Sequence, residues 1–199
     1  MKKKLILVAS PPASGKTYVS QRLAEALGQT VCLDKDDLSQ LLRVGFAAAG
    51  EEMDMDGAFY RENLRAGEYA TLLHLGFTAL RQLQQVLVCA PFGKELRDTE
   101  YMRRLKARAN EAGADLVVIW VWAPPALCRQ RMAQRASDRD TRKLENWESY
   151  AQNINYTPPY ELKSAGAVDH FMVFDNRDAA TMERSLNGAL LLLQDDEAF

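Results

Sequence analysis

Residues 10–17 read Ser-Pro-Pro-Ala-Ser-Gly-Lys-Thr, and they directly follow the apolar run Leu5-Ile6-Leu7-Val8-Ala9. The octapeptide fits the phosphate-binding pattern G-x-x-x-x-G-K-[ST] in every fixed position except the first, where Ser10 replaces glycine. The apolar run predicts a buried parallel strand. A helical pattern covers Lys16–Leu27 and ends before Gly28, a common helix stop. A strand, a loop and a helix in this order are the context that the motif, the P-loop, requires.

The P-loop binds phosphate because its turn directs backbone N–H groups and the positive end of a helix at one point. Gly15 lets the backbone approach closely, Lys16 reaches terminal phosphates, and the Thr17 hydroxyl binds Mg²⁺. The alternative is a chance Gly-Lys-Thr in a Ser/Pro loop, and the flanking strand and helix argue against it. The residues expected to contact a nucleotide here are Pro12, Ala13, Ser14, Gly15, Lys16 and Thr17.

The length predicts one domain over residues 1–199, and the composition, with 47% hydrophobic and 26% charged residues, is ordinary for a globular chain. The net charge of −2 argues against strong attraction to nucleic acid or to an anionic membrane. The three cysteines are scattered, which is typical of free thiols in a reducing compartment. The apolar run after the lysines at 2–4 is too short for a secretion signal, and no run approaches the roughly 20 residues of a membrane span. We therefore expect a cytoplasmic protein.

Short apolar runs alternate with helical patterns, which favours an α/β fold with a parallel sheet and helices on both faces. The expected strands are Lys4–Ala9, Thr30–Leu33, Gln85–Ala90, Leu116–Trp122 and His170–Phe174. The expected helices are Lys16–Leu27, Lys35–Val44, a long one within Phe59–Leu83, Asp98–Ala112, Pro125–Ala136, Thr141–Asn153 and Ala179–Leu193. Gly45–Gly57 is expected to be a loop beside the site, and Ser137–Arg142 a polar turn.

An acidic segment, Asp34-Lys35-Asp36-Asp37, directly follows the second predicted strand. Ligands in such sheets bind at the carboxyl ends of the strands, so these carboxylates belong at the same edge as the P-loop. We expect Asp36 to orient a substrate hydroxyl as a catalytic group; the alternative is that Asp36 or Asp37 caps the next helix. Asp34 is a candidate Mg²⁺ ligand or a cap of the turn. The third and fourth strands end without an acid, so no other strand-end carboxylate is expected at the metal.

Arg131, Arg135 and Arg139 are spaced four apart and would form one stripe on a helix. The functional interpretation is a lid, over residues 129–153, in which Arg131 and Arg135 clamp the transferring phosphate. The alternative is a solvated basic helix with an Asp138–Arg142 pair.

Weaker candidates follow the other strands or lie on the long helix. Asn176 is expected either to face the nucleotide base or to cap the last helix. Arg65, Glu68 and Tyr69 share a helical face, as pocket residues or as a surface ion pair. Lys94, Glu95 and Arg97 follow the third strand, near the site or in a simple turn.

Taken together, the P-loop at 10–17, Asp34-Lys35-Asp36-Asp37, the Ala90-Pro91-Phe92 turn and the arginine-rich segment 129–142 give the chain its resemblance to a known family. It resembles small P-loop kinases of the zeta toxin, chloramphenicol phosphotransferase, gluconate kinase and polynucleotide kinase group, among the AAA-type ATP-binding proteins. The resemblance implies a three-layer P-loop NTPase sandwich with strand order 2-3-1-4-5 and a helical lid. It also implies a substrate-hydroxyl role for Asp36 and phosphate-clamping roles for Arg131 and Arg135. The chain departs from relatives that place an acid where Cys89 stands.

The leading hypothesis is an enzyme, with ATP and Mg²⁺ as cofactors, that moves the γ-phosphate to a hydroxyl of a small molecule. Two alternatives keep the chemistry and change the acceptor: a polynucleotide 5′-hydroxyl kinase and a zeta-toxin-like sugar-nucleotide kinase. Segment 94–108 carries six basic and three acidic residues, which leaves the nucleic-acid acceptor open although it is not favoured. A different class, a nucleotide-dependent switch or binding module without transfer, is the remaining alternative. No membrane partner is expected.

Overall fold

The computed structural model describes residues 2–194, without the side chains of Asp138, Arg139 and Arg142. The third arginine of the predicted stripe, Arg139, and the alternative Asp138–Arg142 pair therefore lie outside the described residues. Among residues 2–194, no helix combines the length and the apolar composition needed to span a bilayer.

Five parallel strands form a single sheet in the order β2-β3-β1-β4-β5, which confirms the predicted topology. The strands are β1 (Lys3–Ala9), β2 (Thr30–Asp34), β3 (Gln85–Cys89), β4 (Ala114–Trp122) and β5 (His170–Asp175). The central strand β1 pairs with β3 on one side and β4 on the other, and residues 5–9 are fully buried. This burial on both faces explains its unbroken apolar sequence.

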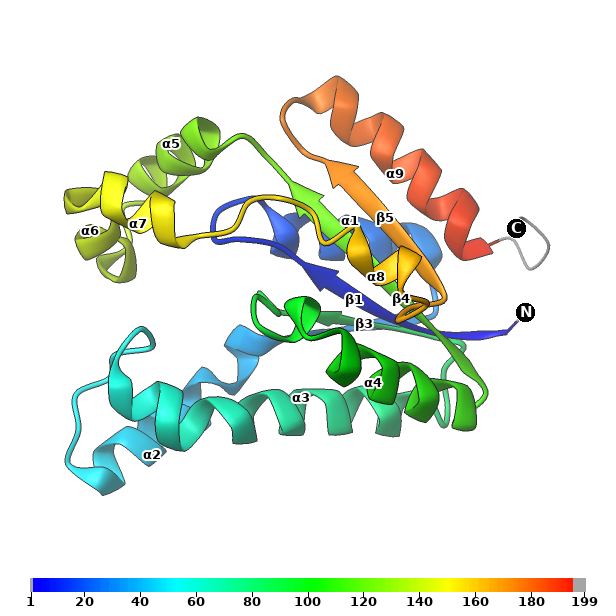
Figure 1. Cartoon of the computed structure of the whole chain (residues 1–199), viewed down its shortest axis with the longest axis horizontal. Helices are drawn as coiled ribbons and strands as arrows, with labels where there is room; N and C mark the ends of the chain where they lie inside the picture. Colours follow the sequence, from blue (N-terminus) through cyan, green and yellow to red (C-terminus); the bar gives the residue numbers. More distant parts are fainter. Residues whose placement is uncertain (1, 195–199) are drawn as a thin grey trace.

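Helices cover both faces of the sheet (Figure 1). The helices are α1 (Lys16–Leu27), α2 (Ser39–Ala49), α3 (Arg65–Ala79), α4 (Thr99–Glu111), α5 (Pro125–Arg135), α6 (Asp138–Glu145), α7 (Trp147–Asn153), α8 (Glu161–Ser164) and α9 (Ala179–Gln194), with 3₁₀ turns η1 (Lys35–Leu38) and η3 (Glu95–Arg97) and a π-helical turn η2 (Tyr60–Leu64). Leu5 and Leu7 pack with α3 and α4, whereas Ile6 and Val8 pack with α1 and α9. The result is the three-layer α/β sandwich of P-loop NTPases.

Two predicted loops are partly helical, so these expectations were wrong. Helix α2 continues to Ala49 through the start of the expected loop Gly45–Gly57, and it ends at Gly50 with φ 72°. The reason is tertiary packing, because Phe46 is buried and its ring lies 5.5 Å from that of Phe59. The expected polar turn Ser137–Arg142 is mostly helix, since α6 begins at Asp138.

Two predicted helices are divided. The helix expected over Lys35–Val44 starts as the 3₁₀ turn η1 and becomes α-helical at Ser39. The helix expected over Thr141–Asn153 is split between α6 and α7 at Asn146, whose φ of −116° and ψ of 38° are not helical. Both breaks lie at the carboxyl edge of the sheet. There α5, α6 and α7 extend beyond the ends of β1 and β4, on the side away from the chain termini (Figure 1).

Candidate active site

The P-loop connects β1 to α1 as predicted. Gly15 has φ 96° and ψ 21°, a conformation that favours glycine, and Ala13 also has a positive φ of 63°. Ser10 is not among the residues with positive φ; it is buried, and its hydroxyl donates to the Pro11 carbonyl at 2.9 Å. The departure from glycine at position 10 therefore costs no backbone strain.

Asn176 and Arg131 hold the loop from two directions. The Asn176 amide donates to the Ser14 carbonyl at 2.8 Å, and Arg131 donates to the same carbonyl at 3.1 Å and to the Asn176 carbonyl at 2.8 Å. A Cβ on Gly15 would lie 2.2 Å from the Asn176 amide nitrogen, so the glycine is needed for this close approach. The P-loop, α5 and the end of β5 are thereby joined.

Asn176 does not cap the last helix, α9, which was one of the two roles predicted for it, because another residue provides that cap. The Asp178 carboxylate accepts from the Thr181 backbone N–H at 2.8 Å, in the first turn of α9. Asn176 itself is buried against the P-loop. Contact between Asn176 and a nucleotide stays a prediction.

Asn176→Ala is expected to destabilise the protein by about 1–3 kcal/mol, because the variant removes a buried donor from the Ser14 carbonyl. Nucleotide affinity should fall with it, since the loop loses one of the two side chains that donate to the Ser14 carbonyl. Thermal unfolding and calorimetric titration with ATP measure the two effects. Asn153→Ala is the matched control, because the exposed Asn153 amide also donates to a carbonyl, that of Ser149. Equal stability of the two variants would contradict the supporting role.

A cavity of about 210 Å³ opens in front of the P-loop. Its lining residues are Ala13, Gly15, Lys16, Thr17, Tyr18, Arg131 and Arg135. Arg135 also donates through Nε to the buried Asp140 carboxylate at 2.8 Å, so a residue of α6 fixes its position. The structure thus brings both described arginines of the stripe to the P-loop, where their guanidinium groups supply the fixed donors that suit phosphate oxygens.

Thr17 lies against the end of β2. Its hydroxyl donates to Asp34 Oδ2 at 3.0 Å, while Asp34 Oδ1 accepts from the Asp36 backbone N–H at 3.0 Å. Asp37 closes a capping box by accepting from the Asp34 N–H at 3.3 Å. The cap of this turn is therefore Asp34, with Asp37 as its partner, which confirms the capping alternative for Asp34. The alternative in which Asp36 or Asp37 caps the following helix was wrong, because α2 begins without a side-chain cap.

A hydroxyl and a carboxylate oxygen side by side match the hard oxygen ligands that Mg²⁺ takes in nucleotide sites. No cluster of three His, Cys, Asp or Glu residues suited to a metal occurs among the side chains that the structure describes. Thr17 and Asp34 would therefore hold Mg²⁺ together with phosphate oxygens and water, and this role stays a prediction for both residues.

The acidic turn is attached to α3 by contacts that the sequence did not reveal. Lys35, between Asp34 and Asp36, is buried and places Nζ 2.9 Å from Glu68 Oε1. The Tyr60 hydroxyl donates to the other oxygen of Glu68. The only sequence signal was a lysine within an acidic segment, and nothing near it in the chain marks its partners.

In the predicted face of Arg65, Glu68 and Tyr69, the last two residues are buried and Arg65 is half-buried, so the face is not an exposed surface ion pair. Arg65 makes a bidentate pair with Glu95 at 2.7 and 2.9 Å, and its guanidinium lies 4.3 Å from the centre of the Tyr69 ring. Glu95 belongs to η3, which follows the end of β3, so the expected turn at 94–97 is present as a 3₁₀ turn. Arg97 donates to Glu161 at 3.0 Å.

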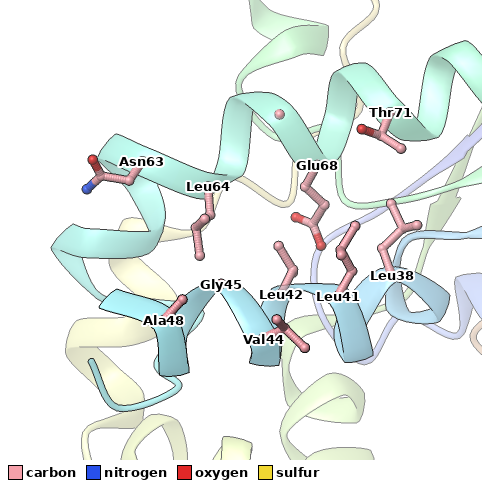
Figure 2. A pocket seen from close by; sticks show the side chains of 11 residues that line it. Leu38, Leu41, Leu42, Val44, Gly45, Ala48, Asn63, Leu64, Glu68 and Thr71 are labelled. Atoms are coloured by element: carbon pink, nitrogen blue, oxygen red, sulfur yellow. The ribbon is translucent and has the colours of Figure 1, made fainter. Parts of the chain in front are cut away.

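Two further features border this edge of the sheet. Lys143 of α6 pairs with Asp56 at 3.0 Å, which joins α6 to the segment after α2. Between α2 and α3 lies a mostly apolar groove of about 350 Å³, into which Glu68 points from α3 (Figure 2).

The cysteines are free thiols, as predicted. Burial, and then the Asp34 carboxylate, raise the pKa of Cys89 to about 12. The same two causes raise the pKa of Cys32 to about 11. Both thiols therefore stay protonated near neutral pH and are poor nucleophiles and metal ligands.

The strand order, the loop at residues 10–17 and the cavity before it define a P-loop NTPase. Residues 5–157 match the profile of the AAA domain family, and the chain belongs to that family. No curated protein matches the sequence.

Solved structures share the fold across almost the whole chain. A provisionally assigned kinase from Chloroflexus aurantiacus is 23% identical, with a TM-score of 0.65, covering 95% of this chain and 97% of that chain. A sugar kinase from Janibacter sp. HTCC2649 is 16% identical, with a TM-score of 0.60 and coverages of 98% and 97%. The Mycobacterium tuberculosis APS kinase, solved with AMPPNP and APS, is 18% identical, with a TM-score of 0.53 and coverages of 96% and 98%. The resemblance to small P-loop kinases is confirmed at the level of the fold.

Proposed function

We propose that this chain is an ATP-dependent kinase that transfers the γ-phosphate to a hydroxyl of a small molecule. The observation that carries the proposal is the cavity before the P-loop, because Lys16, Thr17, Arg131 and Arg135 all line it. These are the groups that phosphoryl transfer requires: donors for terminal phosphates, a hydroxyl for Mg²⁺, and guanidinium groups over the transferring group. When bound, Mg²⁺·ATP would supply the phosphoryl group and part of the charge neutralisation.

In the proposed reaction the acceptor oxygen forms a bond to the γ-phosphorus, and the bond to the β–γ bridging oxygen breaks to leave ADP. Asp36 takes or orients the proton of the acceptor hydroxyl. Support for this role comes from the turn itself: Asp34 is its cap, so the capping alternative does not account for Asp36. Asp36 is exposed, one residue beyond buried Lys35, at the edge where Asp34 meets Thr17.

The similar structures support a small-molecule acceptor. Besides the sugar kinase and the APS kinase, they include a shikimate kinase from Acinetobacter baumannii and a gluconokinase from Sinorhizobium meliloti 1021. Each of these names describes an enzyme that acts on a small compound. The proposal includes a cytosolic location, on the basis of the free thiols and the ordinary composition.

A nucleic-acid acceptor is less well supported by the contacts of segment 94–108. Arg97 pairs with Glu161, Lys106 with Asp169 at 3.1 Å, and Arg104 with Glu100 at 3.4 Å. Acids of the same chain therefore neutralise much of the basic segment, whereas a phosphate-backbone track needs positive charge that is available to the ligand.

Arg131→Ala and Arg135→Ala are expected to lower kcat by on the order of 10-fold or more, because the guanidinium groups stabilise charge that is redistributed in the transition state. Ground-state ATP affinity should change less in Arg135→Ala, whereas Arg131→Ala also removes a donor from the Ser14 carbonyl and should lower that affinity as well. Arg129→Ala is the control, since Arg129 lies on the same helix α5, is exposed and is not among the cavity residues. Steady-state kinetics and ATP titration measure the effects. Full transfer activity in both cavity variants would mean that the arginine stripe is only a solvated basic face of the helix.

The function is tested by incubating the protein with Mg²⁺·ATP and a panel of hydroxyl compounds, chiefly sugars, sugar acids, nucleosides and a 5′-hydroxyl oligonucleotide. ADP release that one class stimulates, with γ-label recovered on that compound, supports the proposal. Stimulation by the oligonucleotide alone would favour the polynucleotide alternative.

A further inference from the structure

The Lys35–Glu68–Tyr60 network connects the acidic turn to the rigid part of the fold. Glu68 lies on α3 beside Tyr69, Leu72 and Leu73, which pack in the core against the sheet. Its side chain is fully buried and that of Lys35 is 11% exposed. The ammonium of Lys35 also lies 5.7 Å from the centre of the Tyr60 ring.

Every member of the network is matched. One Glu68 oxygen accepts a hydrogen bond from Lys35 Nζ at 2.9 Å, and the other accepts one from the Tyr60 hydroxyl. Burial, and then the hydrogen bond to Glu68, raise the pKa of Tyr60 well above its usual range, so the phenol stays a donor. A buried ion pair is costly compared with apolar residues of the same size, so stability alone does not explain it.

Apolar packing supports this connection only in part, because Leu38 of η1 packs against the core cluster that contains Leu72 and Leu73 of α3, while the groove between α2 and α3 begins on the other side. Leu38, the last residue of η1, lines the groove together with Glu68 (Figure 2). Gly45 and Gly67 also line it and bring no side chain to fill it, and a Cβ on Gly67 would meet no atom within 4 Å. The ion pair is thus a principal link between the first residue of η1 and α3.

Lys35 stands between the two carboxylates that the proposed function uses. The Asp34 carboxylate reaches Thr17 on one side and caps the turn at Asp36 on the other. Fixing the backbone at residue 35 therefore fixes the directions of both neighbours relative to the P-loop. Catalytic groups held from a rigid helix keep the sub-ångström placement that transfer needs.

We infer that Lys35 and Glu68 are positioning residues of the active site: their ion pair holds Asp34 at Thr17 and aims Asp36 at the acceptor hydroxyl. The inference rests on the proposed function for its transfer step. Its effect on Asp34 is independent of any acceptor, because it concerns the Thr17–Asp34 contact and the Mg²⁺ that these oxygens would hold.

The test uses the double variant Lys35→Met/Glu68→Leu, because removing one partner alone leaves an uncompensated buried charge that can unfold the chain. Two residues of similar volume remove both charges, so the expected loss of stability is limited to the buried Tyr60 hydroxyl left without its acceptor. Glu100→Gln is the control, since it breaks the exposed Glu100–Arg104 pair on α4. Tyr60→Phe, which keeps the ion pair, should have a smaller effect.

The first readout is the ratio of ATP affinity with Mg²⁺ to that with EDTA, measured by calorimetry without an acceptor. In the double variant this affinity ratio is expected to fall at least threefold, while the ATP affinity measured with EDTA stays unchanged. The second is transfer kcat, expected to fall at least 10-fold while the KM for ATP changes little. A stable double variant with the wild-type Mg²⁺ ratio and kcat would overturn the inference. If the wild type transfers phosphate to no compound, the proposed function fails, and the Mg²⁺ ratio still decides the positioning of Asp34.

Discussion

Lys16→Ala is expected to reduce nucleotide-dependent turnover by on the order of 10²–10³-fold, the usual loss when one fixed donor to a developing charge is removed. Lys16 is the first residue of α1 and lines the cavity before the P-loop. Its ammonium is the cation of the loop that would bind the phosphates. Alanine removes this cation and is a strong helix former, so α1 should be kept. ATP affinity measured by calorimetry should fall as well.

The control for this variant is Lys163→Ala, which removes an exposed lysine from the short helix α8. Both variants should keep the wild-type melting temperature within a few degrees. A folded Lys16→Ala protein that binds and turns over ATP like the wild type would mean that residues 10–17 are not the nucleotide site.

Asp36→Asn should lower phosphoryl transfer by roughly 10²–10⁴-fold, the usual contribution of a positioned acid–base group. The fold and most of the ATP affinity should survive, because asparagine is nearly isosteric and the turn keeps Asp34 as its cap. Melting temperature, ATP affinity and transfer rate are measured on one preparation. The comparison separates a kinase from a nucleotide-dependent switch, because a switch needs no group at the acceptor hydroxyl.

Asp37→Asn is the matched control for this experiment. Asp37 also carries an exposed carboxylate on the same turn, but it closes the capping box with the Asp34 N–H. Its replacement should change stability slightly, since asparagine can also accept that bond, and should leave transfer close to the wild type. Equal transfer rates for the two variants and the wild type would remove Asp36 from the mechanism.

Features coded by neighbouring residues were predictable from the sequence. The P-loop, α1 and the acidic turn after β2 each depend on a short continuous stretch, so spacing and apolar pattern identify them. The sheet order came from the resemblance to small P-loop kinases. The stripe of Arg131 and Arg135 was visible as a spacing of four, although only the structure shows that both line the cavity.

Features that depend on contacts between distant segments were not predictable. Asn176 meets Ser14 across 162 positions, and Lys35 meets Glu68 across 33. The helical end of α2 was missed because Gly45 was expected to start the loop Gly45–Gly57, whereas burial of Phe46 against Phe59 outweighs the weak helix propensity of one glycine. Tertiary packing thus decided the elements around the site, while local sequence decided its phosphate-binding loop.

The most direct test of the central claim is transfer of the γ-phosphate from radiolabelled ATP in the presence of the hydroxyl panel, with wild type and Asp36→Asn compared under identical conditions. We predict one labelled organic phosphate per ADP formed with the wild type, and a rate at least 10²-fold lower with Asp36→Asn. Label recovered only as inorganic phosphate with every compound, at the same rate in both proteins, would contradict the account and leave a nucleotide hydrolase or switch in its place.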